Sequence, residues 1–338
     1  MSNYTFPGGV NTYVPTLHGD LIVEFSRNPD KFALNRYTDI RKVDKQKGYY
    51  VQMKNDGQVR VVSDTDNIWA EGTDSPKVIE GNDQHEFGQF NCIRRRLPKY
   101  LGYLSVEQAG WDILDQEARF LAMQMMTARV KRVHKTLTTS GNWGSNYDTA
   151  TDLGGGTWAN ASSTSPYIRK SLAAAQITIT QQTLGVVQAT DLYVVMNPNT
   201  AKVVATSGEF LDFVKQQPGA VAIWENQLQY RLYGLPENLM GLNVVVDDTV
   251  YNSALPGQTP VLSFTFPDNY AAIITKQKAI TPAAGSAFST FQLFAYEEFV
   301  TEVYNDPENR RYKLYVTENV DDSFLFAPQS GFLIATNS

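Results

Sequence analysis

Residues 105–139 read SVEQAGWDILDQEARFLAMQMMTARVKRVHKTLTT, and this stretch decides how the rest of the chain is interpreted. It has no proline and a single glycine, and strong helix formers dominate it. Ser105 and Gln108 form a capping-box pair at its start. Acidic residues gather in its first turns and basic residues in its last turns, as the helix dipole favours. We therefore predict one helix over 105–139, about 50 Å long.

Apolar residues recur at helical spacing along this stretch, at Val106, Ala109, Ile113, Leu121, Met125, Ala128, Val133 and Leu137. A helix of about 50 Å exceeds the ~30 Å that crosses a small domain. The pattern favours a strut that spans several parts of a molecule. A long core helix of an ordinary enzyme is the alternative.

After residue 164 the sequence changes to an α/β pattern. Ser165 and Pro166 favour the start of one helix, and Asn197 followed by Pro198 favours the start of another. Further helices are predicted over 209–216 and 220–233. Apolar runs predict strands at 192–196, 242–246, 261–266 and 270–274. Together these elements predict one compact α/β unit, within the usual size of a domain.

The sequence before residue 105 predicts an arm and a long hairpin. Residues 1–44 are rich in proline and glycine and contain only short apolar runs, which suits an extended arm. The β-prone stretches 47–53 and 58–62 are separated by Asn-Asp-Gly, a strong hairpin signal, and 86–93 is a third candidate strand. A two-stranded hairpin is marginal alone in water, so we expect it to pack on another copy of the chain.

The last part of the sequence predicts a long β ribbon. Strands are expected over 290–304 and 312–320, on either side of a turn at 305–309. Residues 297–322 contain eight acidic and three basic side chains. The ribbon is therefore expected to be acidic.

Composition excludes several classes of protein. The chain has 338 residues, with 29 Lys+Arg against 35 Asp+Glu, so its net charge is −6. Non-specific nucleic-acid binding depends on cations that neutralise phosphates, and the overall charge disfavours it. The single cysteine, Cys92, rules out an internal disulfide. No stretch approaches the ~18 apolar residues of a membrane span, so we expect an intracellular protein without a membrane segment.

A search for catalytic or metal-binding patterns finds little. His18, His85 and His134 do not lie at metal-ligand spacing from one another or from the cysteine. The glycine run at 154–156 lacks the Lys-Ser/Thr of a phosphate-binding loop. We therefore predict no catalytic, cofactor-binding or metal-binding residues, and no enzyme. The paired carboxylates at 247–248 leave an α/β enzyme with an unfamiliar site as the alternative.

In this order, the arm, hairpin, strut helix, α/β unit and ribbon resemble the major capsid proteins of tailed bacteriophages. Their fold, the Hong Kong ninety-seven type, is shared with encapsulins. The local likeness is best in residues 120–143, 192–201, 209–214 and 241–246. These segments are similar to the spine helix of that family, its exit, and the strand and helices of its axial domain.

The resemblance implies an α+β capsid fold and a division into four parts. These are an N-terminal arm at 1–44, an extended loop at 45–100, a peripheral domain at 101–164 plus 285–338 that contains spine helix 105–139, and an axial domain at 165–284. Some members of the family begin with a cleaved helical scaffold. Because this sequence begins with the arm, we expect a separate scaffolding protein.

The resemblance also implies a structural function without cofactors. Identical chains would assemble as pentamers and hexamers into an icosahedral shell, in the host cytoplasm and later in the virion. The shell would enclose double-stranded DNA without sequence-specific binding and would contact a portal and decoration proteins. An encapsulin-type shell around protein cargo is the alternative within the same fold.

Several residues are candidates for contacts between subunits. The basic cluster at the base of the loop is expected to pair with acidic side chains of a neighbour, in its loop or its ribbon. A solvated charged turn is the alternative, since exposed ion pairs contribute little. Trp69 is a candidate hydrophobic anchor. The full set of candidates is Trp69, Arg94, Arg95, Arg96, Lys99, Glu297 and Glu298.

Overall fold

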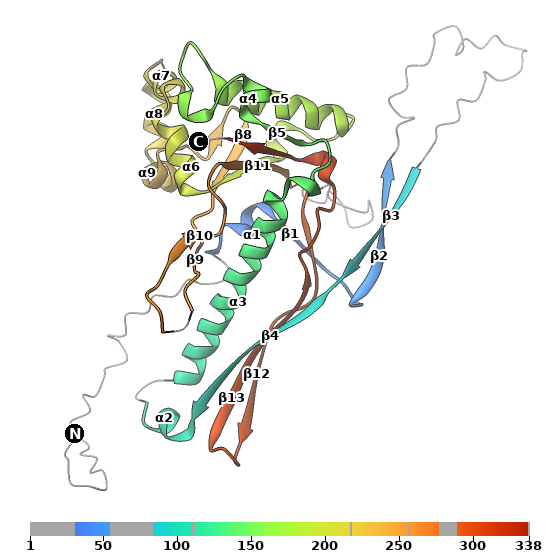
Figure 1. Ribbon diagram of the computed structural model, residues 1–338, viewed down its shortest axis with the longest axis vertical. Helices are drawn as coiled ribbons and strands as arrows, with labels where there is room; N and C mark the ends of the chain where they lie inside the picture. The colour runs from blue at the N-terminus through green and yellow to red at the C-terminus, as the bar shows by residue number, and fades with distance from the viewer. Residues whose placement is uncertain are drawn as a thin grey trace, which may run out of the picture. The chain divides into compact units, whose positions relative to one another are not determined.

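The computed structural model describes residues 31–54, 84–109, 112–216, 218–255, 257–276 and 289–336 (Figure 1). They fall into two compact units. Unit 1 includes Arg95–Met126 and Phe299–Glu318, and unit 2 includes Phe32–Arg94, Thr127–Glu298 and Asn319–Ser338. Helix α3 and strands β4, β12 and β13 each contribute residues to both units.

The predicted helix over 105–139 is wrong in its first part. The structure has a short helix α2 (Tyr103–Glu107) and then α3 (Ile113–Thr138), whose 26 residues span about 39 Å. Ser105 lies inside α2, and no side chain caps that helix. Instead, the Asp112 carboxylate accepts a hydrogen bond from the Asp115 amide at 3.1 Å. The helix start is therefore set by an Asp cap that the sequence analysis overlooked.

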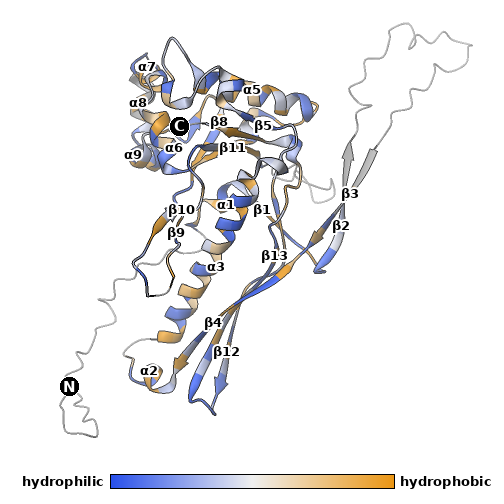
Figure 2. Ribbon diagram, in the orientation of Figure 1, coloured by the Kyte–Doolittle hydropathy of each residue, from blue (hydrophilic) through white to orange (hydrophobic). Residues whose placement is uncertain are grey.

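Helix α3 alternates polar and apolar residues along its length (Figure 2). Its buried apolar side chains are Leu121, Met125, Met126, Val130, Val133 and Leu137. The predicted stripe agrees at four of these positions, whereas Ala128 is exposed. Arg129 and His134 are also buried, so both sides of the stripe are covered. The buried surface of α3 is therefore wider than the predicted apolar stripe and includes polar side chains.

Unit 2 contains a six-stranded sheet with the order β5-β14-β11-β6-β8-β7. Its strands are β5 (Tyr147–Thr149), β6 (Leu192–Met196), β7 (Asn238–Leu239), β8 (Leu242–Val246), β11 (Tyr270–Thr275) and β14 (Phe332–Ala335). β6 and β8 are parallel, with Val194 opposite Val244. Both are almost entirely apolar because a parallel pair inside a sheet is buried on both faces.

β14 pairs with β11, and β5 pairs with β14, so residues from the two ends of the expected peripheral domain complete the α/β sheet. Sequence pattern could not place them, because β5 is a three-residue strand with little apolar character and β14 is a four-residue apolar run, and neither has a partner nearby in the chain. The predicted domain boundaries themselves stay predictions.

Helices lie around this sheet (Figure 1). They are α4 (Ala150–Gly154), α5 (Tyr167–Gln182), α6 (Pro198–Thr206), α7 (Gly208–Gln216), α8 (Pro218–Trp224) and α9 (Leu228–Tyr233). The helix predicted over 220–233 is thus two helices. The predicted cap of α6 is confirmed: the Asn197 side chain accepts from the Thr200 amide at 2.8 Å, and Pro198 takes the first helical position.

The core of unit 2 lies between one sheet face and helices α5, α6 and α7. Alternate strand residues such as Val194, Val244 and Ile273 belong to the same hydrophobic cluster as Leu172 and Ile179 of α5, and all five are buried. Apolar residues alternate along the strands and recur at helical spacing along α5. Both patterns place apolar side chains at the interface between sheet and helix, which is how the sequence specifies this core.

A four-stranded sheet has the order β1-β12-β13-β4, and a two-stranded sheet pairs β2 with β3. The bounds are β1 (Asp39–Lys42), β2 (Lys47–Lys54), β3 (Gln84–Asn91), β4 (Ile93–Gly102), β12 (Gln292–Asp306) and β13 (Arg311–Asp321). Residues 58–62 lie outside the described residues. The terminal ribbon is confirmed as β12 and β13, whose turn contains Pro307–Arg310.

The remaining elements are short. They are helix α1 (Leu34–Tyr37), strands β9 (Val250–Asn252) and β10 (Leu262–Phe264), and the 3-10 helices η4 (Ser140–Asn142), η5 (Trp158–Asn160), η6 (Ala189–Asp191) and η8 (Pro328–Ser330). α1 and β1 lie within the stretch that was expected to be an extended arm. β1 pairs in parallel with β12, so this part of the arm is held by a sheet.

An aromatic cluster fastens the base of the β2–β3 hairpin within unit 2. Phe294 of β12 is 1% exposed and stacks on Phe90, with ring centroids 4.8 Å apart. Tyr50 stacks on Phe294 and on Phe324 at 5.7 and 5.8 Å. The hairpin leaves room for these rings with glycine: a Cβ on Gly48 would lie 2.6 Å from the Phe90 ring.

Candidate assembly surfaces

The basic cluster of the loop base lies on β4. Arg94 and Arg96 are exposed, and Arg95 is half-buried. In unit 1, Arg96 forms an ion pair with Glu302, and its guanidinium lies 3.8 Å from the centre of the Tyr315 ring. The partner found here for Arg96 therefore belongs to its own chain.

Lys99 has a partner in unit 1 as well. Its Nζ lies 3.3 Å from Glu117 Oε2. On the same face of β4, Leu97 packs against Leu121 and Leu314. Pairing of the cluster with a neighbouring subunit stays a prediction, and Arg96 and Lys99 would have to exchange or share these partners.

The acidic candidates lie on β12. Glu298 pairs with the buried Arg129 at 3.3 Å, and Glu297 is half-buried. The turn of the ribbon is not acidic, because residues 305–313 contain two acidic and three basic side chains. Trp69 lies outside the described residues.

The charges of the ribbon turn are paired internally. Asp306 accepts hydrogen bonds from Lys313 Nζ at 2.9 Å, Asn309 Nδ2 at 2.9 Å and Arg311 Nε at 3.0 Å. The Lys313 bond, with help from the other two, holds the pKa of the Asp306 carboxyl well below its usual range. The turn is thus ordered by three charge-assisted or polar contacts.

Replacing Arg96 with alanine is expected to lower the free energy of unfolding by only about 0.5–1 kcal/mol, because it removes an exposed ion pair and a cation–π contact. Urea denaturation measures this change. Arg94→Ala, an exposed arginine on the same strand, is the matched control and should change stability less. A loss of more than about 2 kcal/mol for Arg96→Ala would contradict the exposed-pair description.

The paired carboxylates at 247–248 are held by the fold. Asp247 is fully buried, and its Oδ1 accepts from the amide and hydroxyl of Thr249 at 3.0 and 2.6 Å. Its Oδ2 accepts from Tyr37 Oη at 2.9 Å and lies 3.2 Å from His134 Nε2. Asp248 accepts from Tyr233 Oη at 3.1 Å. Both carboxylates therefore have hydrogen-bond partners within unit 2.

Hydrogen-bond directions assign the state of His134. The Thr265 hydroxyl donates to the Thr249 carbonyl at 3.1 Å, so it accepts from His134 Nδ1 at 2.9 Å. The Tyr37 hydroxyl donates to Asp247, so its oxygen accepts from His134 Nε2 at 2.7 Å. Both ring nitrogens then carry a hydrogen, and the ring faces Asp247 as a cation.

This charge pair governs the pKa values around it. Burial alone would raise the pKa of Asp247, but the charge of His134 and the hydrogen bonds from His134 and Thr249 outweigh burial and hold that pKa well below its usual range. Burial, followed by the charge of Asp247 and the hydrogen bond to it, raises the pKa of Tyr37. The network joins α1, α3 and the segment after β8 in unit 2.

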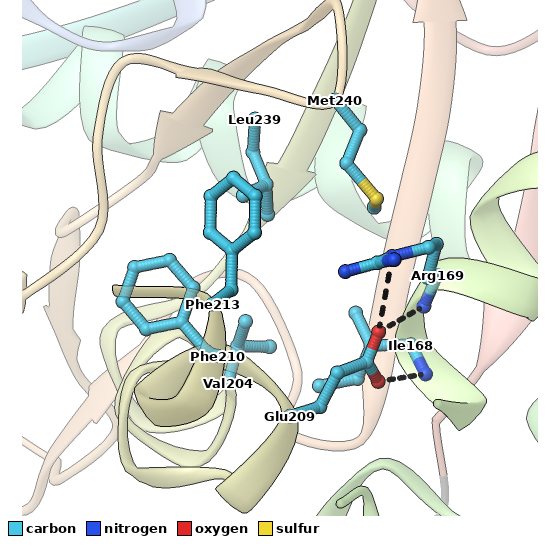
Figure 3. Close-up of a pocket in the computed structure, with 8 residues that line it drawn as sticks. All are labelled: Ile168, Arg169, Val204, Glu209, Phe210, Phe213, Leu239 and Met240. Atoms are coloured by element: carbon cyan, nitrogen blue, oxygen red, sulfur yellow. Dashed lines mark hydrogen bonds and ion pairs between the residues drawn. The ribbon is translucent and has the colours of Figure 1, made fainter. Parts of the chain in front are cut away.

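A small cavity lies beside the N-terminus of α5 (Figure 3). Its volume is about 30 Å³, enough for about one water molecule. The Glu209 carboxylate points at the backbone of α5 and accepts from the amides of Ile168 and Arg169 at 3.0 and 3.1 Å. Burial raises the pKa of Glu209 despite these bonds. The arrangement caps a helix and leaves no room for a substrate.

Within the described residues, no group of three or more His, Cys, Asp or Glu side chains could hold a metal ion. In the same part of the chain, no helix is long and apolar enough to cross a bilayer.

A groove that the sequence did not reveal lies at the base of the β2–β3 hairpin, wholly within unit 2. Its volume is about 1300 Å³. Aromatic side chains line it, including Tyr50, Phe90 and Phe294, together with four cations from the segment 41–47. That segment reads RKVDKQK, and its density of positive charge was the available signal.

The fold defines a class: an α+β chain in which a compact α/β sheet is combined with a long helix, an extended hairpin and a long terminal ribbon. No family model matches the sequence, and no curated protein does. Solved structures do match it. The predicted fold of bacteriophage major capsid proteins is confirmed by them, and this chain has that fold.

Three of these structures cover nearly all of the chain. A phage-related protein from Bordetella bronchiseptica has a TM-score of 0.60 and 11% identity, over 91% of this chain and 92% of that chain. The mature capsid of bacteriophage PhiM1 has a TM-score of 0.54 and 11% identity, over 97% and 93%. The capsid of an empty GTA particle has a TM-score of 0.51 and 12% identity, over 93% and 91%.

Proposed function

We propose that this protein is the major capsid protein of a tailed bacteriophage. Identical chains assemble as pentamers and hexamers into an icosahedral shell that encloses double-stranded DNA. The shell forms in the host cytoplasm with a separate scaffolding protein, and it contacts a portal and decoration proteins. The protein has no catalytic activity and needs no cofactor.

The observation that carries this proposal is the agreement in fold with capsid structures over more than nine-tenths of both chains. A capsid subunit needs long elements that bury their surfaces only against neighbours. Exposed apolar side chains on such elements support the proposal: Tyr49 and Phe87 of the hairpin are 71% and 67% exposed, and Val303 and Tyr304 of the ribbon are 51% and 50% exposed. Surfaces of this kind are typical of protein interfaces.

The state of the carboxylate pair at 247–248 weakens the enzyme alternative. Asp247 is fully buried and bonded to Tyr37, His134 and Thr249. A catalytic carboxylate must reach a substrate, directly or through one water molecule. The known partners of this pair instead stabilise unit 2.

Expression of the full chain, followed by sedimentation and negative-stain imaging, tests the proposal. We expect closed particles of megadalton mass, because capsid interfaces close by symmetry. Co-expression with candidate scaffolding proteins is the second arm, since a scaffold is part of the proposal. A stable monomer or dimer in both arms would contradict a shell. Particles that enclose protein cargo and no DNA would favour the encapsulin alternative.

A further inference from the structure

A short segment gives the groove at the hairpin base its positive charge. Residues 41–47 read RKVDKQK and contain four basic side chains and one acidic side chain. The whole chain has a net charge of −6, so the remaining residues are more acidic still. A positive segment in an acidic protein attracts an anion locally, even though the overall charge disfavours one.

The four cations of this segment are available to a ligand. Arg41 and Lys42 end β1, Lys47 begins β2, and Lys45 lies in the bend between the two strands. All four are exposed and line the groove. Within the described part of the chain, none of them forms an ion pair.

The acidic residues that line the groove do not neutralise these cations. Asp321 is buried, and its carboxylate accepts from the Asn91 amide at 2.7 Å and from the amide and hydroxyl of Ser323 at 3.1 and 2.6 Å. Asp44 is exposed, so four cations face one exposed carboxylate. An anionic ligand would neutralise the positive charge that is left.

The bend that holds the cations is fastened on both sides. The Val43 amide donates to the Ala295 carbonyl at 2.9 Å, and the Gln46 carbonyl accepts from the Cys92 amide at 2.8 Å. The Val43 side chain packs against the aromatic cluster at the hairpin base. The backbone of the segment is therefore ordered before a ligand binds, which lowers the entropic cost of binding.

The aromatic side chains in the wall of the groove contact one another. Phe90 and Phe294 are buried and stack on each other, and Tyr50 stacks on Phe324 with ring centroids 5.8 Å apart. A nucleotide base that stacked in this wall would have to displace these contacts. Tyr49 also lines the groove, and because it is 71% exposed its hydroxyl can donate to a phosphate oxygen. The groove thus suits a ligand that is recognised by its charge.

Double-stranded DNA has a matching charge. Its two strands together carry one negative charge per ~1.7 Å of helix axis, so four cations within seven residues can contact several neighbouring phosphates. Because the cations are exposed, phosphates can reach them without entering the groove. An acidic protein segment is the other candidate polyanion. DNA is favoured because a filled shell would hold it at high local concentration beside every subunit.

We propose that Arg41, Lys42, Lys45 and Lys47 form a phosphate-binding site for the double-stranded DNA that the shell encloses. Each chain contributes one weak contact, and many copies act together on one DNA molecule. The contact is independent of sequence, since phosphates carry no sequence information. This inference rests on the proposed function, because it identifies the part of the subunit that meets the enclosed DNA.

Binding of the unassembled full chain to a DNA duplex, followed by fluorescence anisotropy over a series of salt concentrations, tests the site. Lys45→Gln with Lys47→Gln should weaken binding about tenfold or more at low salt. It should also reduce the slope of log K against log salt by about 2, because each phosphate contact contributes about 0.9 to that slope.

The matched control is Lys170→Gln with Lys202→Gln, which removes the same charge at exposed positions outside the groove. It should leave the affinity and the salt slope unchanged. Equal losses in the two double variants would show that only the net charge of the chain matters, and they would overturn the proposal.

The choice of probe separates DNA from an acidic protein partner. Two duplexes of unrelated sequence should bind equally well, and a strong preference for one of them would contradict a phosphate site. Polyglutamate is the probe for an acidic segment. If it binds the wild-type chain more tightly than the duplex does at equal charge, the groove receives protein and the proposal is wrong.

Lysine acetylation tests the contact in assembled particles. DNA-filled and empty particles, separated by density, are treated with an amine-acetylating reagent and analysed by mass spectrometry. We expect Lys45 and Lys47 to react several-fold less in filled particles, whereas Lys170 and Lys202 react equally in both. Equal reactivity of the groove lysines in both kinds of particle would overturn the proposal. Protection in both kinds would also overturn it, because protein would then cover the site.

The outcomes separate this inference from the proposed function. If the wild-type chain forms no particles with or without a scaffold, the proposed function falls and this inference falls with it. If particles with DNA form and the groove lysines behave like the control lysines in both assays, only the groove proposal falls.

Discussion

Replacing Asp247 with alanine is expected to lower the free energy of unfolding by about 3–5 kcal/mol, because it leaves the buried cation of His134 without its counter-charge. Both side chains are fully buried, so the remaining charge would lie in an interior of low dielectric constant. Thr249 and Tyr37 would lose their acceptor as well. Chemical denaturation of the unassembled chain, followed by far-UV circular dichroism, measures the change.

Two control variants separate the charge pair from general disruption. Asp248→Ala alters the neighbouring, half-buried carboxylate and should cost clearly less. Tyr37→Phe keeps the ring and removes only its hydroxyl, so a loss of about 1–3 kcal/mol is expected. If Asp247→Ala costs no more than Asp248→Ala, the buried pair does not stabilise unit 2 as described.

The pH dependence of stability supplies a further check on this pair. The folded-state pKa of Asp247 lies below its usual value. Its contribution is therefore present above the unfolded-state pKa of about 3.9 and is lost as the pH falls toward the folded-state value. The alanine variant should lack this part of the acid sensitivity, so the two stability curves should converge as the pH falls below about 4.

The sequence predicted the elements whose signals are local. Strands β6 and β8 are short apolar runs that are followed by polar residues. At the start of α6, Asn197 supplies the capping side chain and Pro198 supplies a φ angle suited to the helix. Each of these signals acts over a few residues. A single sequence is therefore enough to locate them.

Other features depended on contacts between distant parts of the chain. β14 joins β11 some 60 residues away, and the Tyr37–His134–Asp247 network joins three segments that no spacing rule connects. The capping box predicted at Ser105 does not form, because Ser105 lies inside α2 and Asp112 caps the longer helix. Local chemistry alone could not decide between the two starts.

The candidate residues for contacts between subunits show the same limit of prediction from local sequence. Arg96 and Lys99 were chosen because they form a dense basic run, and both lie on a strand whose own chain supplies Glu302 and Glu117. The less dense run at 41–47 remains unpaired within the described residues. Which cations are available depends on strand pairing, and the sequence did not specify that pairing.

Replacing Phe294 with alanine is expected to lower the free energy of unfolding of unit 2 by about 3–5 kcal/mol, the usual cost of removing a buried phenylalanine ring. The ring is 1% exposed and contacts Phe90, Tyr50 and Phe324. A cavity at this position would loosen the base of the β2–β3 hairpin. Hydrogen exchange of the β2 and β3 amides, together with denaturation, measures both effects.

Tyr49→Ala is the matched control, because Tyr49 lies on β2 beside Tyr50 but is 71% exposed, so the unassembled chain should lose less than about 0.5 kcal/mol. In particle assembly, the comparison of Phe294→Ala with Tyr49→Ala is the decisive result. Phe294→Ala removes the wall of the groove and the support of the hairpin together, so it should prevent assembly even at temperatures where the chain stays folded. Unchanged hydrogen exchange in β2 and β3 would mean that another contact fastens the hairpin, and the aromatic cluster would then be core packing alone.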